Sequence, residues 1–370
     1  MEVDDHARYG PSLNRDLLSW SSVVPVVDLS RRGQRFASEF AKAAERIAAS
    51  GKFLLGAELS AFESEFAEWL GARHCVAVSS GAAALQLALA AAGIDAGDEV
   101  LVPAFTAVPT ASAVASVGAV PRAIDVDPHT ACITSESVEA GRTSRTKAVI
   151  LVHLYGYPAP LPATDLMVIE DAAQAHGALH DPGRSAATAY SFYPTKNLGG
   201  IGDGGAVVTK SPDLEARVRT LRVHGMTDQY VHESVSQNFR MSEVEAAWLR
   251  LALVDLATDV AQRRAIVGRY RQAAPGLCWQ TADASHAYHL AVFRSADRTG
   301  TRAALERDGI ATAVHYPLAI SQQPAYRDLT HASCPQAEGW AAECISVPCF
   351  PEMTGAEVDR VCTALAGLVE

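Results

Sequence analysis

The chain has 370 residues, of which 49% are hydrophobic and 20% charged, and its formal net charge is −11. This composition predicts a folded globular protein, and at this length we expect a large and a small domain. The acidic excess argues against non-specific nucleic-acid binding, although a local basic pocket could still hold an anionic small molecule.

Nothing in the sequence indicates a secreted, metal-binding or membrane protein. The seven cysteines are scattered and lack paired metal spacing, which predicts reduced thiols in a cytoplasmic protein and no metal site. No apolar run approaches the length of a membrane span, and the N-terminus, with Asp4 and Asp5, is unlike a signal peptide. Residues 1–22 are predicted to be a poorly ordered N-terminal extension.

Predicted helices and strands alternate along the first half of the chain. Apolar residues keep helical spacing over 36–50 and 57–70. The alternation that follows predicts an α/β fold, in which a mostly parallel central sheet is flanked by helices on both faces and ligands bind beyond the carboxyl ends of its strands. The strands are predicted over 74–78, 99–102, 120–125, 148–152 and 167–170, and the helices between them over 81–92 and 107–117.

A long helix is predicted over 242–273, and Pro275 follows its end. The remainder alternates short strands with helices and is predicted to form a smaller C-terminal α+β domain. The predicted division is an extension over 1–22, a large domain over 23–250, and the connecting helix with the small domain over 251–370. One face of the long helix is predicted to carry Val244, Ala247, Trp248, Leu251 and Val254.

One lysine has unusual neighbours. Lys196 follows a short β-like run that begins at Ser191, and it precedes a glycine-rich loop over 199–205. Upstream, a predicted strand ends in Glu170 and Asp171. A lysine among apolar residues with an acid nearby suits a Schiff base to an aldehyde cofactor, which predicts a pyridoxal phosphate (PLP) enzyme. For any lysine taken alone, an ordinary surface position is the alternative.

Each part of PLP needs its own protein partner. The phosphate needs backbone N–H donors at a helix start, which the turn with Gly81 and Ala82 supplies; an ordinary helix cap is the alternative for that turn. Ser191 can add a hydroxyl donor to the same phosphate. Asp171 can pair with the pyridine nitrogen, and Gln174 can donate to the phenolic oxygen. A helix cap is the alternative for Asp171.

Motifs that surround these residues follow one another over most of the chain. They include Ser80-Gly-Ala-Ala-Ala-Leu85, Ile169-Glu-Asp-Ala-Ala-Gln-Ala-His-Gly177, Ser191-Phe-Tyr-Pro-Thr-Lys-Asn197 and His315-Tyr-Pro317. Together the motifs resemble the DegT/StrS family of PLP-dependent nucleotide-sugar aminotransferases of fold type I, over residues 24–368. The resemblance implies that Lys196 forms the covalent bond to PLP, that Asp171 pairs with the pyridine nitrogen and that Ser191 binds the phosphate.

The resemblance also implies contacts with a partner subunit and with the substrate. Asn238 is implied to reach the phosphate in the partner's site, which makes the active unit a homodimer; a helix cap is the alternative for Asn238. His315 and Tyr316 are implied to lie near the sugar. His153 and His176 could touch the sugar too, or could be hydrogen-bonded structural histidines.

Two positions depart from the family pattern. Ala82 stands where a threonine is common, so one hydroxyl contact to the phosphate is missing. Ala107 stands where an aromatic residue often stacks on the cofactor ring, which leaves open what covers that face. Arg31, Arg32 and Arg35 could meet a diphosphate, but a solvated helix start is the preferred interpretation of these arginines.

The implied activity is the transfer of an amino group from glutamate or glutamine to a nucleotide-linked keto-sugar. The segments 24–29 and 51–56 resemble relatives that aminate carbon 3 slightly more than relatives that act at carbon 4. The alternatives are a cyclitol aminotransferase and a non-catalytic, PLP-binding regulatory protein. A related sugar dehydratase would carry histidine in place of Lys196.

Overall fold

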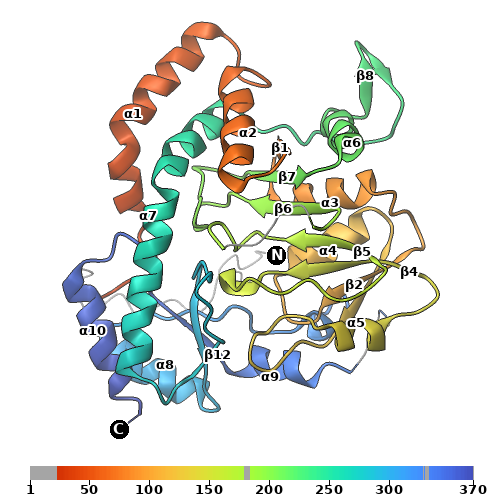
Figure 1. Ribbon diagram of the computed structural model, residues 1–370. Coiled ribbons are helices and arrows are strands. Elements are labelled where there is room, and N and C mark those ends of the chain that lie inside the picture. Colours follow the sequence, from red (N-terminus) through yellow and green to blue (C-terminus); the bar gives the residue numbers. More distant parts are fainter. Residues whose placement is uncertain (1–22, 179–183, 328, 330–332, 370) are drawn as a thin grey trace, which may run out of the picture.

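The computed structural model describes residues 23–178, 184–327, 329 and 333–369, so the predicted extension over 1–22 lies outside the described residues. A seven-stranded sheet with the order β1-β7-β6-β5-β4-β2-β3 forms the centre (Figure 1). Within it β7 runs antiparallel to both neighbours and the other pairs are parallel, which confirms the predicted sheet. The strands are β1 (His74–Val78), β2 (Glu99–Pro103), β3 (Val120–Ile124), β4 (Thr146–Val152), β5 (Met167–Asp171), β6 (Ala187–Ser191) and β7 (Gly205–Thr209).

The register of three parallel strands gathers polar residues at one edge of this sheet. Val152, the last residue of β4, pairs with Asp171, the last residue of β5. Asp171 in turn pairs with Ala189 of β6, two residues before Ser191 ends that strand. Because parallel strands end at the same edge, Asp171 and Ser191 face the space where ligands bind in such sheets.

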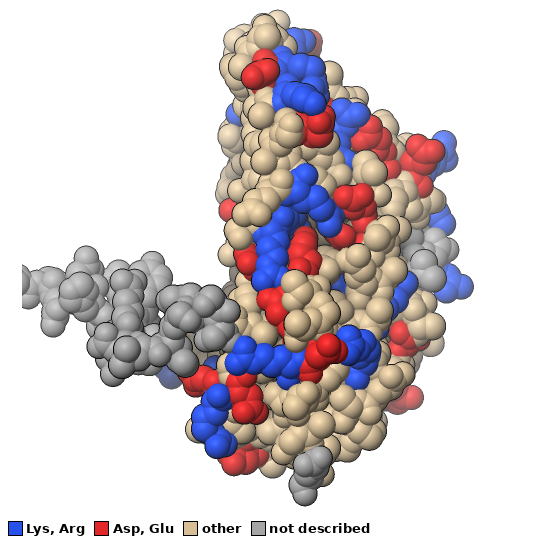
Figure 2. Space-filling view, turned by 90° about the vertical axis from the view of Figure 1, so that its left-hand side faces the viewer, with Lys and Arg blue, Asp and Glu red and all other residues tan. Residues whose placement is uncertain are grey.

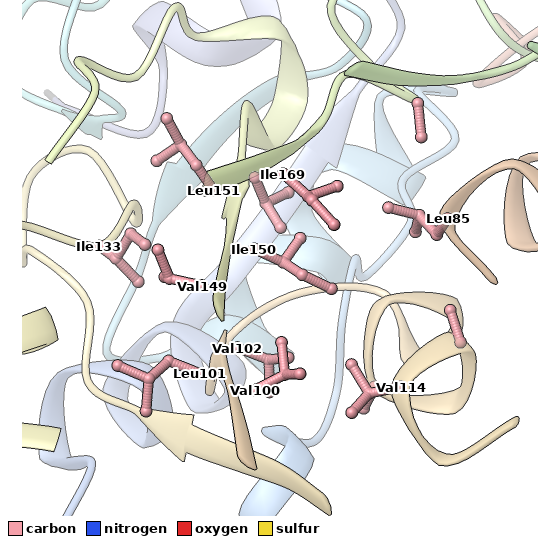
Figure 3. Packing of buried hydrophobic residues seen from close by; sticks show 14 of the residues in the cluster. Leu85, Val100, Leu101, Val102, Val114, Ile133, Val149, Ile150, Leu151 and Ile169 are labelled. Atoms are coloured by element: carbon pink, nitrogen blue, oxygen red, sulfur yellow. The ribbon is translucent and has the colours of Figure 1, made fainter. Parts of the chain in front are cut away.

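Helices cover both faces of the sheet, as the alternating pattern predicted. On one face α3 and α4 pack on the strands through residues such as Leu85, Val114 and Ile150, which Figure 3 shows packed together. On the other face Phe62 of α2 and Leu249 of α7 belong to a second core. The helices of this part are α1 (Leu29–Ser50), α2 (Ala57–Leu70), α3 (Gly81–Ala91), α4 (Val108–Ser116), α5 (Ser135–Gly141), α6 (Pro212–Arg222) and α7 (Glu243–Ala273).

The C-terminal part forms a smaller α+β unit, as predicted, around an antiparallel sheet with the order β10-β11-β12. Its helix α9 packs on the large core instead, where Trp340 is buried and Asp125 accepts the Ala337 N–H at 2.8 Å. Helix α7 runs unbroken through residue 250, and the division at that residue stays a prediction. The elements are β10 (Cys278–Trp279), β11 (Ala291–Arg294), α8 (Arg298–Arg307), α9 (Pro335–Glu343), β12 (Cys344–Val347) and α10 (Gly355–Ala366), while a hairpin of β8 (Met226–Asp228) and β9 (Val231–His232) precedes α7.

Two details of the predicted helices are wrong. Helix α1 begins at Leu29, before the predicted position 36, because the Asp28 side chain accepts the Ser30 N–H and caps the helix. Val254 is not buried with the rest of the predicted face of α7, because it is 82% exposed. It lies seven residues after the buried Ala247 and so within about 20° of the same direction, but Ala247 packs against Ala43 and Ile47 of α1 and Val254 is not part of that cluster.

The surface mixes charges of both signs. Figure 2 shows basic and acidic side chains interspersed on one side of the molecule. Helix α7 forms such pairs with α1, as in Arg35 with Asp259 at 2.8 Å, and with α2, as in Arg250 with Glu65 at 2.6 Å. In the described part of the chain, no helix is both long enough and apolar enough to cross a membrane.

Candidate active site

A cavity of about 270 Å³ lies at the carboxyl ends of β4, β5 and β6. Val152, Asp171 and Ser191, which end these strands, all line it. A larger cavity of about 640 Å³, between α3, α6 and the segment before α7, is lined by none of the predicted site residues. The smaller cavity is therefore the candidate site. Its predicted members are Gly81, Ala82, Asp171, Gln174, Ser191 and Lys196.

Lys196 reaches the cavity from the loop that joins β6 to β7. Its backbone N–H donates to the Tyr193 carbonyl at 2.8 Å, which makes a tight turn at the end of β6. Burial lowers the pKa of Lys196 from 10.5 to about 8, although the charge of Asp171 acts in the opposite direction. A substantial neutral fraction near pH 8 makes this amine a nucleophile and a proton acceptor.

Asp171 is held from two sides. Its Oδ2 accepts a hydrogen bond from the Thr110 hydroxyl at 2.8 Å, and its Oδ1 accepts one from the Ala173 N–H at 3.1 Å. Burial raises the pKa of Asp171, while these bonds and the charge of Lys196 favour the ionised form. No helix follows β5 over residues 172–178, so the helix-cap alternative for Asp171 is wrong.

The start of α3 forms a tight cradle with the ends of β6 and β7. The Ser80 hydroxyl accepts the Ala83 N–H at 3.1 Å and caps α3, as the helix-cap interpretation predicted. A Cβ atom at Gly81 would lie 2.5 Å from the Cβ of Ser191, and one at Gly205 would lie 2.3 Å from the Ser80 carbonyl oxygen. Only glycine fits at both positions, and the close approach at Gly81 places Ser191 beside the first turn of α3, at the positive end of the helix dipole.

The predicted substrate residues His315 and Tyr316 do not line the cavity themselves, but Gln174, which does, contacts Tyr316. The Gln174 side chain accepts the Tyr155 backbone N–H at 2.5 Å and donates to the Tyr316 hydroxyl at 3.0 Å. Burial raises the pKa of Tyr316 to about 12, so its hydroxyl stays protonated at neutral pH. The His315 ring bonds the Ser346 hydroxyl at 2.8 Å, and burial lowers its pKa to about 4. His315 is therefore a neutral imidazole.

Residues 34–366 match the DegT/DnrJ/EryC1/StrS aminotransferase family. The chain belongs to this family. It is 40% identical to the erythromycin biosynthesis sensory transduction protein EryC1 of Saccharopolyspora erythraea, over 92% of this chain and 98% of that protein. It is 39% identical to a dTDP-3-amino-3,4,6-trideoxy-alpha-D-glucose transaminase of Streptomyces venezuelae, over 92% and 95% of the two chains.

Solved structures of related proteins agree with this assignment. The structure of S. venezuelae DesV in complex with a ketimine intermediate is 37% identical, with a TM-score of 0.89, and the match covers 94% of this chain and 99% of DesV. NtdA from Bacillus subtilis with the bound cofactor PMP is 28% identical, with a TM-score of 0.87, over 96% and 86% of the two chains. The sugar-aminotransferase family and the fold expected from the sequence are both confirmed.

Within this aminotransferase fold, Asn238 does not line the cavity of its own chain. Its side chain is exposed and accepts a hydrogen bond from Arg240 at 2.8 Å. The cap of α7 is Ser242, whose hydroxyl accepts the Glu245 N–H at 3.1 Å, so the helix-cap alternative for Asn238 is wrong. The implied role of Asn238 in a partner's site stays a prediction.

The two histidines and the arginine that the sequence analysis considered as possible substrate contacts are buried and packed against other parts of the protein. His153 is buried, bonds Glu170 at 2.8 Å and accepts the Ala159 N–H at 3.1 Å, as the structural interpretation predicted. His176 is buried against Tyr190 and other aromatic rings of the second core. Arg32 was expected to lie in solvent at a helix start, and this expectation is wrong. Arg32 is 4% exposed and donates to the carbonyl of Lys196 at 3.1 Å.

The sequence reasoning missed Thr110. This residue lies in the first turn of α4 and joins Asp171 to Thr106, whose hydroxyl is 3.1 Å away. Thr106 precedes the start of α4, so helical spacing does not relate the two threonines, and the sequence carried no signal for this contact. Ala107 lines the cavity together with Pro109 and Leu154, and none of these three side chains is aromatic.

Proposed function

We propose that this chain is a PLP-dependent aminotransferase that moves an amino group from glutamate or glutamine to a nucleotide-linked keto-sugar, with a preference for 3-keto sugars. The observation that carries the proposal is the joint presence of Lys196, Asp171 and the α3 start in one cavity. These three supply an amine, a carboxylate and an anion site, which are the partners that the aldehyde, the pyridine nitrogen and the phosphate of PLP need.

The residues present fit PLP. The Gly81 and Ser191 cradle at the start of α3 would hold the phosphate, because an added Cβ at Gly81 would fill the space beside Ser191. Asp171, fixed by Thr110, would hold the ring nitrogen. When bound, PLP supplies an electron sink that stabilises negative charge at the carbon from which a proton is removed.

Lys196 performs the proton transfers in this proposal. With a pKa of about 8, its released amine can accept a proton from the α-carbon of the amino donor and return it on the same face of the cofactor. Thr110 and Ala173 both donate to the Asp171 carboxyl group, so they fix its position and favour its ionised form against the effect of burial. Tyr316, which Gln174 links to the cavity, and the neutral His315 next to it are the proposed partners of substrate hydroxyl groups.

The preference for a 3-keto sugar rests on relatives. The S. venezuelae relative is named for a 3-amino sugar, and segments 24–29 and 51–56 favour the same carbon. Screening dTDP- and UDP-linked 3-keto and 4-keto sugars and a keto-inositol, each with glutamate and glutamine, tests this choice. Turnover of a 4-keto sugar alone would move the proposal to carbon 4, and turnover of keto-inositol alone would establish the cyclitol alternative.

A non-catalytic regulatory function is the second candidate, because the EryC1 relative is named a sensory transduction protein. The purified protein should be yellow, and glutamate should bleach the colour as the cofactor takes up the amino group. A yellow protein whose spectrum changes with neither donor would support the regulatory alternative. The presence of Lys196 argues against a sugar dehydratase, because the related dehydratases carry histidine at this position.

We also propose that the active unit is a homodimer to which Asn238 contributes across the interface. Asn238 is exposed, and the segment before it carries exposed apolar side chains: Tyr230 is 84%, Val231 50% and Val235 104% exposed. Such a surface is typical of a protein interface. Mixing inactive Lys196→Ala and Asn238→Ala proteins should restore activity in hybrid dimers, because one site then has both residues. No restoration after subunit exchange would contradict the shared site.

A further inference from the structure

The loop that carries Lys196 is a compact turn whose backbone segments pack closely against one another. Besides the Lys196 to Tyr193 bond, the Gly200 N–H donates to the Phe192 carbonyl at 2.7 Å. A Cβ atom at Gly199 would lie 2.2 Å from the Pro194 carbonyl oxygen, so the backbone segments touch. The place of the lysine amine therefore depends on what holds this turn from outside the cavity.

Three side chains outside the cavity contact the turn. Arg32 of α1 donates to the Lys196 carbonyl at 3.1 Å, and Trp248 of α7 donates through its indole N–H to the Gly199 carbonyl at 2.9 Å. Glu245, one helical turn before Trp248, is 5% exposed, and its carboxyl group lies against the backbone of the turn: a Cβ atom at Gly200 would lie 1.5 Å from its Oε1, and one at Gly202 would lie 3.4 Å from its Oε2. The turn is thus held on both sides of the lysine.

Glu245 is an unusual choice for this position. Its Oε1 lies directly over Gly200, where an added Cβ would come within 1.5 Å of it, and this oxygen is buried without a hydrogen-bond partner among the described residues. Burial raises the pKa of Glu245 to about 7, against the effect of the backbone N–H groups of Ile201 and Gly202. An unsatisfied buried oxygen destabilises a fold, so stability alone does not explain a carboxyl group here.

We propose that Glu245 is a positioning residue that fixes the Gly200–Gly202 backbone and thereby holds the Lys196 amine opposite Asp171. This role rests on the proposed function. Glu245 acts through the backbone and not through its charge, since burial and Asp171 are the influences on the Lys196 amine. A positioned amine reacts faster because it spends more time in the reactive geometry.

The chain offers a matched control on the same helix. Glu243 is 2% exposed, and its carboxylate accepts backbone N–H groups of Gly56 and Glu58 at 2.8 Å each. It therefore has a comparable role as a buried acceptor in the first turn of α7, but it serves the start of α2 and not the lysine turn. A purely structural effect should be similar in Glu243→Ala and Glu245→Ala.

The test compares the full-length wild type with Glu245→Ala, Glu245→Gln and Glu243→Ala. PLP is added to cofactor-free protein, and formation of its covalent bond with Lys196 is followed by absorbance well below each melting temperature. Amide exchange of residues 196–202 and kcat and KM with glutamate complete the measurements. Glu245→Ala should slow bond formation and lower kcat by about tenfold to a hundredfold, with KM changed less than about threefold, and speed the exchange.

Glu245→Gln keeps an acceptor oxygen and should recover most of the rate, while Glu243→Ala should lower the melting temperature without slowing bond formation. Wild-type rates in Glu245→Ala, or equal losses in Glu243→Ala, would overturn the positioning role while leaving the proposed function intact. A wild type that forms no bond with PLP would refute the proposed function, and this role with it.

Discussion

Replacing Lys196 with methionine should stabilise the cofactor-free protein near neutral pH. Burial lowers the pKa of Lys196 from 10.5 to about 8 in the folded chain, so folding disfavours the protonated amine. The difference between these values corresponds to about 3 kcal/mol, at about 1.4 kcal/mol per pKa unit. Lys196→Met removes this charge while keeping an unbranched apolar chain, so its free energy of unfolding at pH 7 should exceed that of the wild type by roughly that amount.

The dependence on pH is the decisive part of this prediction. Below pH 8 the amine is protonated in both states, and the whole destabilisation is present. Between pH 8 and 10.5 the unfolded chain binds more protons than the folded chain, so wild-type stability rises with pH relative to Lys196→Met. Above that window the electrostatic difference has vanished, and what remains is the constant effect of exchanging the side chains.

Urea unfolding of the two cofactor-free proteins at pH 7, 8, 9 and 10 measures the difference. Lys147→Met, on an exposed position of β4, controls for the removal of a lysine as such. A difference between wild type and Lys196→Met that stays constant from pH 7 to pH 10 would refute the reasoning, because a change in packing alone does not depend on pH. A difference that grows with pH would mean that the sign is wrong.

Three further outcomes follow from the site. Gly81→Ala should weaken PLP binding at least about tenfold in a spectroscopic titration, since its Cβ would lie 2.5 Å from the Cβ of Ser191; unchanged affinity would contradict the cradle. Asp171→Asn keeps the hydrogen bond with Thr110 and should leave the protein yellow, but kcat should fall by about a hundredfold or more; near-normal turnover would remove the carboxylate from its role. His153→Ala breaks a buried pair and should lower unfolding stability by about 3 kcal/mol without changing the PLP spectrum, and a cofactor defect at normal stability would point to a direct role instead.

The sequence predicted what is local. The order of apolar and polar residues indicated the sheet, because a buried parallel strand appears as a short apolar run and an amphipathic helix as apolar residues three or four positions apart. Residue type indicated the chemistry: Lys196, Asp171 and Ser191 line one cavity because each follows or ends a strand at the same edge. The predicted start of α1 and the predicted burial of Val254 were wrong because they depend on a capping side chain and on how far α1 covers α7.

Contacts between distant parts of the chain came only from the tertiary structure. Thr110 meets Asp171 across 61 residues, and Arg32 meets the Lys196 carbonyl across 164. No period or motif records such pairs, because they arise where packed helices and strands happen to bring side chains within hydrogen-bonding distance. The residue types in the sequence thus determined which chemistry this protein is equipped for, while the packing of α1, α4 and α7 around the sheet decided which side chains hold the lysine and the carboxylate in place.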